Sequence, residues 1–357
     1  MTDRGALGLL RDVLSVYSPS GGEGELAAFL RDRLRRLGFA AEIDEMGNVV
    51  AALGEVPRMG GHERPDLLLL GHIDTVPGFI PVREDGGRLY GRGAVDAKGP
   101  FVAFVAALLR ARPALEGRGV VLVGAVGEES EGLGARHLIP RFRPRAVVVG
   151  EPSGWDGIVL GYKGRLTVRY CVRVPVTHSA SPEPTAPERA LEFWRRLCLY
   201  TRRFNRGRTR RFHALDVALK RMASAEDGLV DRAELSLVFR LPPDLDPASL
   251  RREVRRMAMG AEVSFGGGER AFTAPKNTPL VRALLRAIRA AGGKPRFVLK
   301  TGTSDMNLVG PAWGCPVVAY GPGDSRLDHT PDEHIEISEF LRGIAVLSRV
   351  LELVSPQ

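Results

Sequence analysis

Cysteine is scarce in this chain, and its pattern excludes two common ways of stabilising a fold. The 357 residues contain three cysteines, Cys171, Cys198 and Cys315, an odd set without a Cys-x-x-Cys spacing. Such a set supports neither a disulfide framework nor a zinc site made of thiolates. We therefore expect all three cysteines to be reduced and structural.

Long hydrophobic runs are also absent. No apolar stretch approaches the roughly 20 residues that span a bilayer, and the start of the chain, 1–4, lacks the basic-then-apolar order of a signal peptide. We find no internal repeat and no low-complexity linker. With 44% hydrophobic and 26% charged residues over this length, the sequence predicts a cytoplasmic protein of two globular domains without a membrane partner.

Acidic residues are too few to balance the basic ones, and the imbalance is local. The net charge is +9, and the stretch from Gly164 to Gly267 alone carries 20 Lys and Arg against 12 Asp and Glu. Its densest part, 202–211, holds six arginines and no acid, which indicates either a solvated surface or a docking surface for an acidic macromolecule. Few aromatic residues accompany these arginines, which argues against a nucleic-acid partner bound by base stacking.

Helical and strand patterns alternate up to about residue 160, which predicts an α/β domain around a parallel or mixed sheet. The expected helices are 6–17, 23–37, 98–110 and 131–139. The expected strands are 41–43, 49–52, 67–70, 120–126 and 146–150.

The pattern then changes to that of a smaller α+β unit, and the first domain resumes after it. The insertion is expected to contain strands at 161–174, 233–239 and 261–265 and helices at 186–204 and 246–259. The resumed part has a helix at 278–291, a strand at 316–320 and a helix at 337–353. The prediction is an α/β domain (1–163 and 268–357) with a mixed, mostly parallel sheet flanked by helices, and an inserted α+β domain at 164–267.

His72 and Asp74 leave together from the end of an apolar run, Leu67–Gly71. Such a run is typical of a central parallel strand covered on both faces, and ligands bind beyond the carboxyl ends of such strands. Separated by one residue, the two side chains point to the same side of an extended chain. Asp74 can therefore accept a hydrogen bond from the imidazole and leave its other nitrogen free to bind a metal.

Further acids and a second histidine follow other segments of the predicted sheet. They are Asp96, Glu128, Glu129, Glu151 and His329. Asp96 begins a helix and is also in a position to cap it, and the adjacent glutamates repel each other unless a cation lies between them. Two histidines and several carboxylates suit zinc, cobalt or manganese, and one carboxylate can bridge two ions about 3.5–4 Å apart.

Five segments resemble the motifs of the M20 metallopeptidase and deacylase family, which includes acetylornithine deacetylase, succinyl-diaminopimelate desuccinylase and carboxypeptidases. They are Gly71–Pro77, Gly91–Gly99, Gly127–Glu129, Gly150–Pro152 and the late His329. The resemblance extends over nearly the whole chain. It implies hydrolysis of an acyl-amino bond, with the inserted domain acting as a lid and dimerisation domain.

The resemblance implies two divalent metal ions, zinc as the first choice and cobalt as the alternative. His72 and Glu151 would bind one ion, Glu129 and His329 the other, and Asp96 both.

The resemblance also assigns catalytic roles. Glu128 would be the general base, and Asp74 would orient His72. His178 would reach the site from the other subunit of a homodimer and stabilise the oxyanion; the alternative for His178 is an ordinary surface histidine.

Two further places in the chain resemble substrate contacts of the family. Arg240 is a candidate for holding a substrate carboxylate, with an ordinary strand-edge arginine as the alternative. Gly302 and Thr303 lie in a segment that resembles the substrate loop.

Three segments point to one branch of the family. The compact Pro77–Arg83, with Gly91–Pro100 and Val159–Gly164, resembles the branch that releases lysine or ornithine from the small acidic amino-group carrier protein LysW. A basic inserted domain is an independent reason to expect an acidic carrier. We therefore expect a di-metal amidohydrolase of lysine or arginine biosynthesis. The rivals are a small-molecule deacylase, such as acetylornithine deacetylase or succinyl-diaminopimelate desuccinylase, and a nucleic-acid-binding protein with a degenerate metal site.

Overall fold

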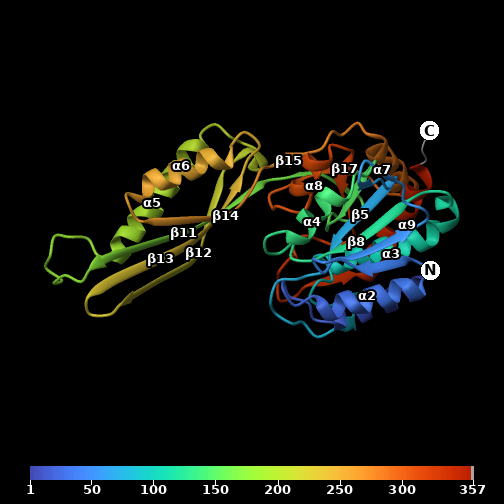
Figure 1. Cartoon of the computed structure of the whole chain (residues 1–357), viewed down its shortest axis with the longest axis horizontal. Helices are drawn as coiled ribbons and strands as arrows, with labels where there is room; N and C mark the ends of the chain where they lie inside the picture. Colours follow the sequence, from blue (N-terminus) through green and yellow to red (C-terminus); the bar gives the residue numbers. More distant parts are fainter. Residues whose placement is uncertain (355–357) are drawn as a thin grey trace. The chain divides into compact units, whose positions relative to one another are not determined.

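The computed structural model describes residues 1–354 as two compact units (Figure 1). The first unit consists of Met1–Gly161, Thr273–Val298 and the chain from Leu308 onward. The second consists of Tyr162–Phe272 and the short segment Leu299–Asn307.

The first unit is built on a nine-stranded sheet with the order β1-β2-β8-β5-β9-β17-β10-β15, and β16 pairs with β10. Its strands are β1 (Ala40–Ile43), β2 (Val49–Leu53), β5 (Leu67–His72), β8 (Val120–Ala125), β9 (Val147–Gly150), β10 (Gly157–Tyr162), β15 (Phe272–Thr273), β16 (Arg296–Lys300) and β17 (Val317–Ala319). The central strands β8, β5, β9 and β17 run parallel, whereas β1, β2 and β10 pair antiparallel. The expected mixed sheet is therefore confirmed, with its parallel part at the centre.

Helices flank this sheet, some of them in direct contact with it and others packed on those helices. They are α1 (Asp3–Ser15), α2 (Gly24–Arg36), α3 (Lys98–Ala111), α4 (Leu133–Arg141), α7 (Pro279–Ala290), α8 (Met306–Trp313) and α9 (Ile337–Leu353), with a 3-10 turn at Arg112–Leu115. Helix α3 is apolar almost all round because it contacts the sheet on one side and α1 and α9 on the other. Among the described residues, no helix is both long and apolar enough to cross a bilayer.

Glycines near the carboxyl ends of the central strands allow α3 to approach the sheet closely. A Cβ atom on Gly71 would lie 3.3 Å from the Phe101 ring, and one on Gly150 would lie 2.7 Å from the Phe104 ring. Both glycines directly precede candidate metal ligands. The aromatic rings of α3 therefore pack directly against the strand ends that carry His72 and Glu151.

A small antiparallel sheet lies in the same unit and was not predicted from the sequence. It consists of β6 (Arg83–Asp85), β7 (Arg88–Tyr90) and β18 (His334–Glu336), in the order β18-β7-β6. Each strand is only three residues long; β6 is exposed, and β7 and β18 each bury a single residue, Leu89 and Ile335, which is too short a pattern to indicate a strand. A two-stranded hairpin, β3 (Arg58–Met59) and β4 (His62–Glu63), was missed for the same reason.

The second unit is a four-stranded antiparallel sheet covered by α5 and α6 on one face (Figure 1). Its elements are β11 (Gly164–Pro175), α5 (Ala186–Phe204), a 3-10 turn at Arg211–His213, β12 (Asp216–Glu226), β13 (Val230–Leu241), α6 (Pro247–Ala258) and β14 (Glu262–Glu269). The strand order is β12-β13-β11-β14. The sequence did not predict β12, because this edge strand is largely exposed and lacks a buried alternating face.

Candidate metal centre

The candidate site lies at the carboxyl ends of the parallel strands β5, β8 and β9. In the register of the sheet, His72 at the end of β5 lies beside Ala125 of β8. On the other side Gly71 pairs with Gly150, so Glu151 leaves β9 next to His72. Parallel strands thus deliver side chains to one edge, where such sheets bind ligands.

His72 is buried and held through its Nδ1 atom. Nδ1 donates to the backbone carbonyl oxygen of Asp74 at 3.0 Å and also lies 3.4 Å from the Asp74 carboxylate. With its proton on Nδ1, the imidazole presents the lone pair of Nε2, which lies 3.1 Å from Oδ1 of Asp96. This is the arrangement in which a metal-ligating histidine is oriented by a neighbouring acceptor.

Asp96 lies between two imidazoles. Its Oδ1 is 3.1 Å from Nε2 of His72, and its Oδ2 is 3.1 Å from Nε2 of His329. It does not cap α3, because the N-cap is Ala97 and makes no side-chain cap bond. A carboxylate with one oxygen facing each histidine suits the bridging position between two ions.

Glu129 completes the cluster. Its Oε1 lies 2.7 Å from Nε2 of His329. One donor atom each of His72, Asp96 and Glu129 lie within 4.8 Å of one another. Nitrogen and oxygen donors without a thiolate fit zinc, cobalt or manganese.

Electrostatics point to a cation at the same place. Burial alone would lower the pKa of His72, but hydrogen bonds to Asp74 and Asp96 outweigh burial and raise that pKa well above its usual value. Hydrogen bonds to Asp96 and Glu129 raise the pKa of His329 to about 10. For Asp96, burial opposes ionisation, yet the two histidines lower its pKa. The buried carboxylates of Asp96 and Glu129 therefore need a positive charge beside them, which protonated imidazoles or bound metal ions supply.

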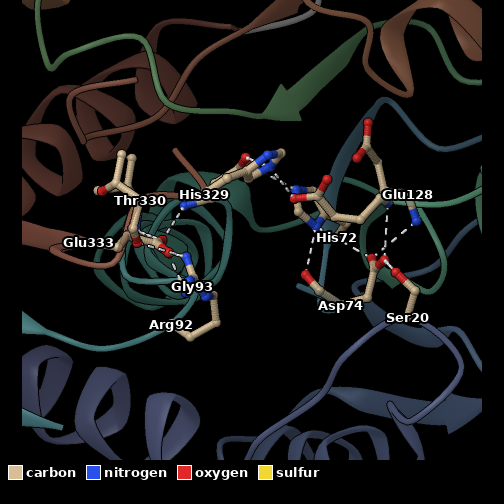
Figure 2. Close-up of polar contacts among 12 residues, drawn as sticks. Ser20, His72, Asp74, Arg92, Gly93, Glu128, His329, Thr330 and Glu333 are labelled. Atoms are coloured by element: carbon tan, nitrogen blue, oxygen red, sulfur yellow. Dashed lines mark hydrogen bonds and ion pairs between the residues drawn. The ribbon is translucent and has the colours of Figure 1, made fainter. Parts of the chain in front are cut away.

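The Asp74 carboxylate also holds the turn that carries the two adjacent glutamates. Its Oδ1 accepts the backbone N–H of Glu128 at 3.1 Å, and its Oδ2 accepts the N–H of Glu129 at 3.0 Å. Ser20 donates its hydroxyl to the same carboxylate at 2.7 Å. Figure 2 shows the Glu128 side chain pointing away from Asp74. The turn that carries Glu128 and Glu129 is therefore fixed through its backbone N–H groups.

Glu151 is buried at the end of β9. Strand register places it beside His72, although it is not one of the three residues whose donor atoms lie within 4.8 Å.

The remaining predicted residues belong to the second unit. His178 is exposed in the segment between β11 and α5, and its Nδ1 accepts the Ala180 N–H at 3.1 Å. The ring proton of neutral His178 is therefore on Nε2, which can act as a donor.

Arg240 and the segment containing Gly302 meet within the second unit. Nη1 of Arg240 donates to the Thr303 hydroxyl at 2.9 Å, and that hydroxyl donates to the Lys163 carbonyl oxygen at 2.8 Å. Gly302 is half-buried beside Thr303. The structure thus joins the two substrate-binding candidates by one hydrogen-bond chain.

Three residues around the site were missed by sequence reasoning. Ser20 lies in a Ser-Pro-Ser-Gly-Gly segment, which is typical of a turn and gives no indication of a functional residue. Arg92 and Glu333 form a buried ion pair at 2.8 Å. No local pattern connects two residues 241 positions apart, although Arg92 lies inside one of the glycine-rich motifs.

Comparisons with known proteins agree with this geometry. The profile of Peptidase family M20/M25/M40 matches residues 68–353. A LysW-lysine hydrolase of Deinococcus radiodurans is 43% identical over 351 residues, covering 96% of this chain and 95% of the relative. A LysW-lysine/LysW-ornithine hydrolase of Saccharolobus islandicus is 28% identical over 354 residues, covering 96% and 94%.

Solved structures share the fold. An M20 family metallo-carboxypeptidase from Sulfolobus solfataricus aligns with a TM-score of 0.80 at 20% identity, covering 98% of this chain and 99% of the other. A tripeptidase from Staphylococcus aureus aligns with a TM-score of 0.79 at 18% identity and covers 100% of both chains.

Proposed function

This chain belongs to peptidase family M20/M25/M40, and we propose that it releases lysine, ornithine or both from an acidic carrier protein of the LysW type. The reaction is hydrolysis of an amide bond. The observation that carries the chemistry is the Asp96 carboxylate between the imidazoles of His72 and His329. The choice of substrate is supported by the names of the similar proteins, which are LysW-lysine and LysW-ornithine hydrolases.

The donor set fits two divalent ions, with zinc as the first choice and cobalt as the alternative. His72 and Glu151 would hold one ion, Glu129 and His329 the other, and Asp96 both. When bound, such ions polarise the amide carbonyl and lower the pKa of the attacking water.

Glu128 is the proposed general base. Its carboxylate accepts a proton from the attacking water and then delivers that proton to the departing amine. The support is its position: the backbone of Glu128 is anchored to Asp74, beside the residues that would hold the metal ions. Asp74 thereby sets the orientation of His72 and of the base together.

His178 is proposed to donate a hydrogen bond from Nε2 to the oxyanion that forms during the attack. We propose that the protein is a homodimer in which each site uses the partner subunit's His178. The exposed position of His178 and its Nδ1 acceptor role support this assignment, because an Nε2–H group on an exposed ring is a suitable donor.

Arg240 is proposed to bind the α-carboxylate of the released amino acid. Its guanidinium is held by Thr303, and planar donors of this kind recognise carboxylates by two parallel bonds. Gly302 lies next to Thr303 and would leave room for the substrate.

The carrier is proposed to dock on the basic second unit. The segment 202–211 contains six arginines and no acid, and most of these side chains are exposed. Opposite charge accelerates encounter and suppresses wrong partners. Release of lysine or ornithine from such a carrier would be a step of lysine or arginine biosynthesis.

The test is amine release from three substrates measured side by side: carrier-bound lysine, carrier-bound ornithine and acetylornithine. We expect kcat/KM for at least one carrier substrate to exceed that for acetylornithine by orders of magnitude. Glu128→Gln serves as the background control. A preference for acetylornithine would refute the carrier assignment while leaving the hydrolase assignment intact.

A further inference from the structure

Glu333 is a buried carboxylate that binds the backbone of the loop carrying Asp96. Its side chain is only 1% exposed. Its Oε1 accepts three backbone N–H groups, from Gly93 at 3.0 Å, Val95 at 3.0 Å and Asp96 at 3.1 Å. One carboxylate oxygen thus determines the path of this loop up to the proposed bridging ligand.

Arg92 joins Glu333 to the segment carrying His329. Its Nη1 donates to Oε2 of Glu333 at 2.8 Å and to the carbonyl oxygen of Thr330, the residue after His329, at 3.1 Å. Its Nε donates to the Gly78 carbonyl oxygen at 2.9 Å. Figure 2 shows Arg92, Glu333 and Thr330 beside His329.

The two segments are paired by strands as well. β7 leads directly into the Asp96 loop and β18 follows the His329 segment, and Tyr90 pairs with His334. His329 has a φ of 63°, in a region that non-glycine residues seldom adopt. Neighbouring contacts must therefore hold this backbone in place.

We propose that Arg92 and Glu333 are positioning residues that set the separation of Asp96 and His329 and thereby the affinity for the metal ion these two ligands share. This inference rests on the proposed di-metal site and adds to it the residues that shape one half of it. Neither Arg92 nor Glu333 is among the residues proposed to bind the ions or the substrate.

A purely structural role explains the pair poorly. Burying an arginine and a glutamate has a desolvation cost, and well-packed apolar residues of similar volume often stabilise a core as well or better. Within residues 1–354, the hydrogen bonds of the Glu333 side chain all go to the loop of Asp96 or to Arg92. Partners that orient metal ligands in this indirect way typically change metal affinity or activity by 10-fold to 100-fold, to order of magnitude, when they are mutated.

Two conservative variants test the proposal. Glu333→Gln keeps an oxygen for the three N–H groups, but its NH2 group then faces the Arg92 guanidinium, so the ion pair is lost. Arg92→Lys keeps the positive charge but loses the fork that reaches Thr330 and Gly78. The matched control is Glu63→Gln, which disrupts ion pairs with Arg58 and Arg141 just before the amino end of β5, the opposite end from His72.

Metal content after dialysis against graded chelator is the main measurement, with cobalt absorption spectra of the reloaded proteins and thermal unfolding of the metal-free proteins alongside. We expect both variants to lose one of two ions at about 10-fold to 100-fold lower chelator concentration than the wild type. Saturating cobalt should restore kcat while KM stays near its wild-type value. The control should retain both ions as the wild type does.

Three results would overturn the inference: unchanged metal retention in both variants, equal weakening of both ions, or the same metal loss in Glu63→Gln. If the metal-free variants unfold at lower temperature but keep the wild-type metal affinity, the pair is only structural. A wild-type protein that binds fewer than two ions would instead refute the proposed site itself.

Discussion

At the scale of single residues, Asp74 connects more parts of the site than any predicted ligand does. Its carboxylate accepts the backbone N–H groups of Glu128 and Glu129 and lies 3.4 Å from Nδ1 of His72. The Asp74 side chain is fully buried. Burial raises the pKa of a carboxyl group, but here the hydrogen bond from His72 and further donors lower the pKa of Asp74. An ionised, buried carboxylate with several hydrogen bonds can hold His72 and the turn of Glu128 in one orientation, which an exposed carboxylate cannot do.

The general base can be separated from the ligands by one substitution. Glu128→Gln should reduce turnover to background while the metal content stays near two ions per chain, because an amide cannot take a proton from water. Elemental analysis and amine release measure the two quantities. Glu131→Gln, at an exposed acid in the same loop, is the control and should remain active. Substantial activity in Glu128→Gln would assign the base elsewhere.

Removing ligands should have graded effects. Asp96→Ala should lose both ions, because its two oxygens face both histidines. His72→Ala and His329→Ala should each lose one ion preferentially along with activity. Metal content by elemental analysis, after dialysis at fixed chelator concentration, checks this order. If all three variants retained two ions, the ligand assignment would be wrong.

At the scale of elements, the short hydroxyl bridge at Thr303 connects β13 with the junction between β10 and β11. Thr303→Val removes the acceptor of Arg240 and the donor to Lys163. We expect KM to rise by up to about 10-fold with a smaller change in kcat, since one hydrogen bond contributes roughly 0.5–1.5 kcal/mol. Steady-state kinetics measure the split. Thr303→Ser keeps the hydroxyl and should behave as the wild type; equal effects in both variants would exclude the bridge as the cause.

Long elements with a periodic buried face could mostly be predicted from the sequence, but the fully buried strand β10 was not predicted, because its six residues show no alternation. Helices α5 and α9 begin and end where periodicity placed them, because each has an apolar stripe against a sheet or helix. Strands β12 and β6 lack a buried alternating face, and β7 and β18 of the small sheet bury only one residue each.

In the candidate site, some residues could likewise be predicted from the sequence and others could not. His72 and Asp74 stand at the end of an apolar run, which is a local signal. The contacts of Ser20 with Asp74 and of Arg92 with Glu333 span 54 and 241 positions. Only the folded sheet brings such residues together, so no local spacing reveals them.

At the scale of the whole molecule, the proposed homodimer makes a prediction about mixtures. His178→Ala alone should lower turnover by about 10²–10³-fold with metal ions and fold intact, because one oxyanion donor is lost. Mixing it with Glu128→Gln should restore activity in hybrid dimers, to about a quarter of the wild type if equal amounts exchange at random. Amine release after demonstrated subunit exchange is the measurement. The absence of recovery would mean that His178 acts within its own chain or has no role.

Not all arginines of the basic segment 202–211 are available to bind a partner. Arg208 is bound twice to Asp244, at 3.1 and 2.6 Å, and lies over the Phe204 ring. Arg202 and Arg203 end α5, where acidic replacements would oppose the helix dipole. Arg206 and Arg210 lie outside the helix and are exposed, so they are the positions where charge can be reversed with least effect on folding.

Reversing Arg206 and Arg210 to glutamate should therefore weaken use of the carrier substrate through slower encounter, since rim charges act mainly on association. Turnover of a short acyl-lysine surrogate should stay nearly unchanged, because these arginines are not among the proposed catalytic or metal-binding residues. The matched control reverses Arg169 and Arg221, two exposed arginines on the strands of the same unit. Wild-type kcat/KM on the carrier should fall with added salt, given a Debye length of roughly 10 Å at 0.1 M, and the Arg206 and Arg210 variant should lose much of that salt dependence. Equal losses on both substrates would assign the two arginines to folding or dimerisation, and equal losses in the control would mean that net charge, not this segment, attracts the carrier.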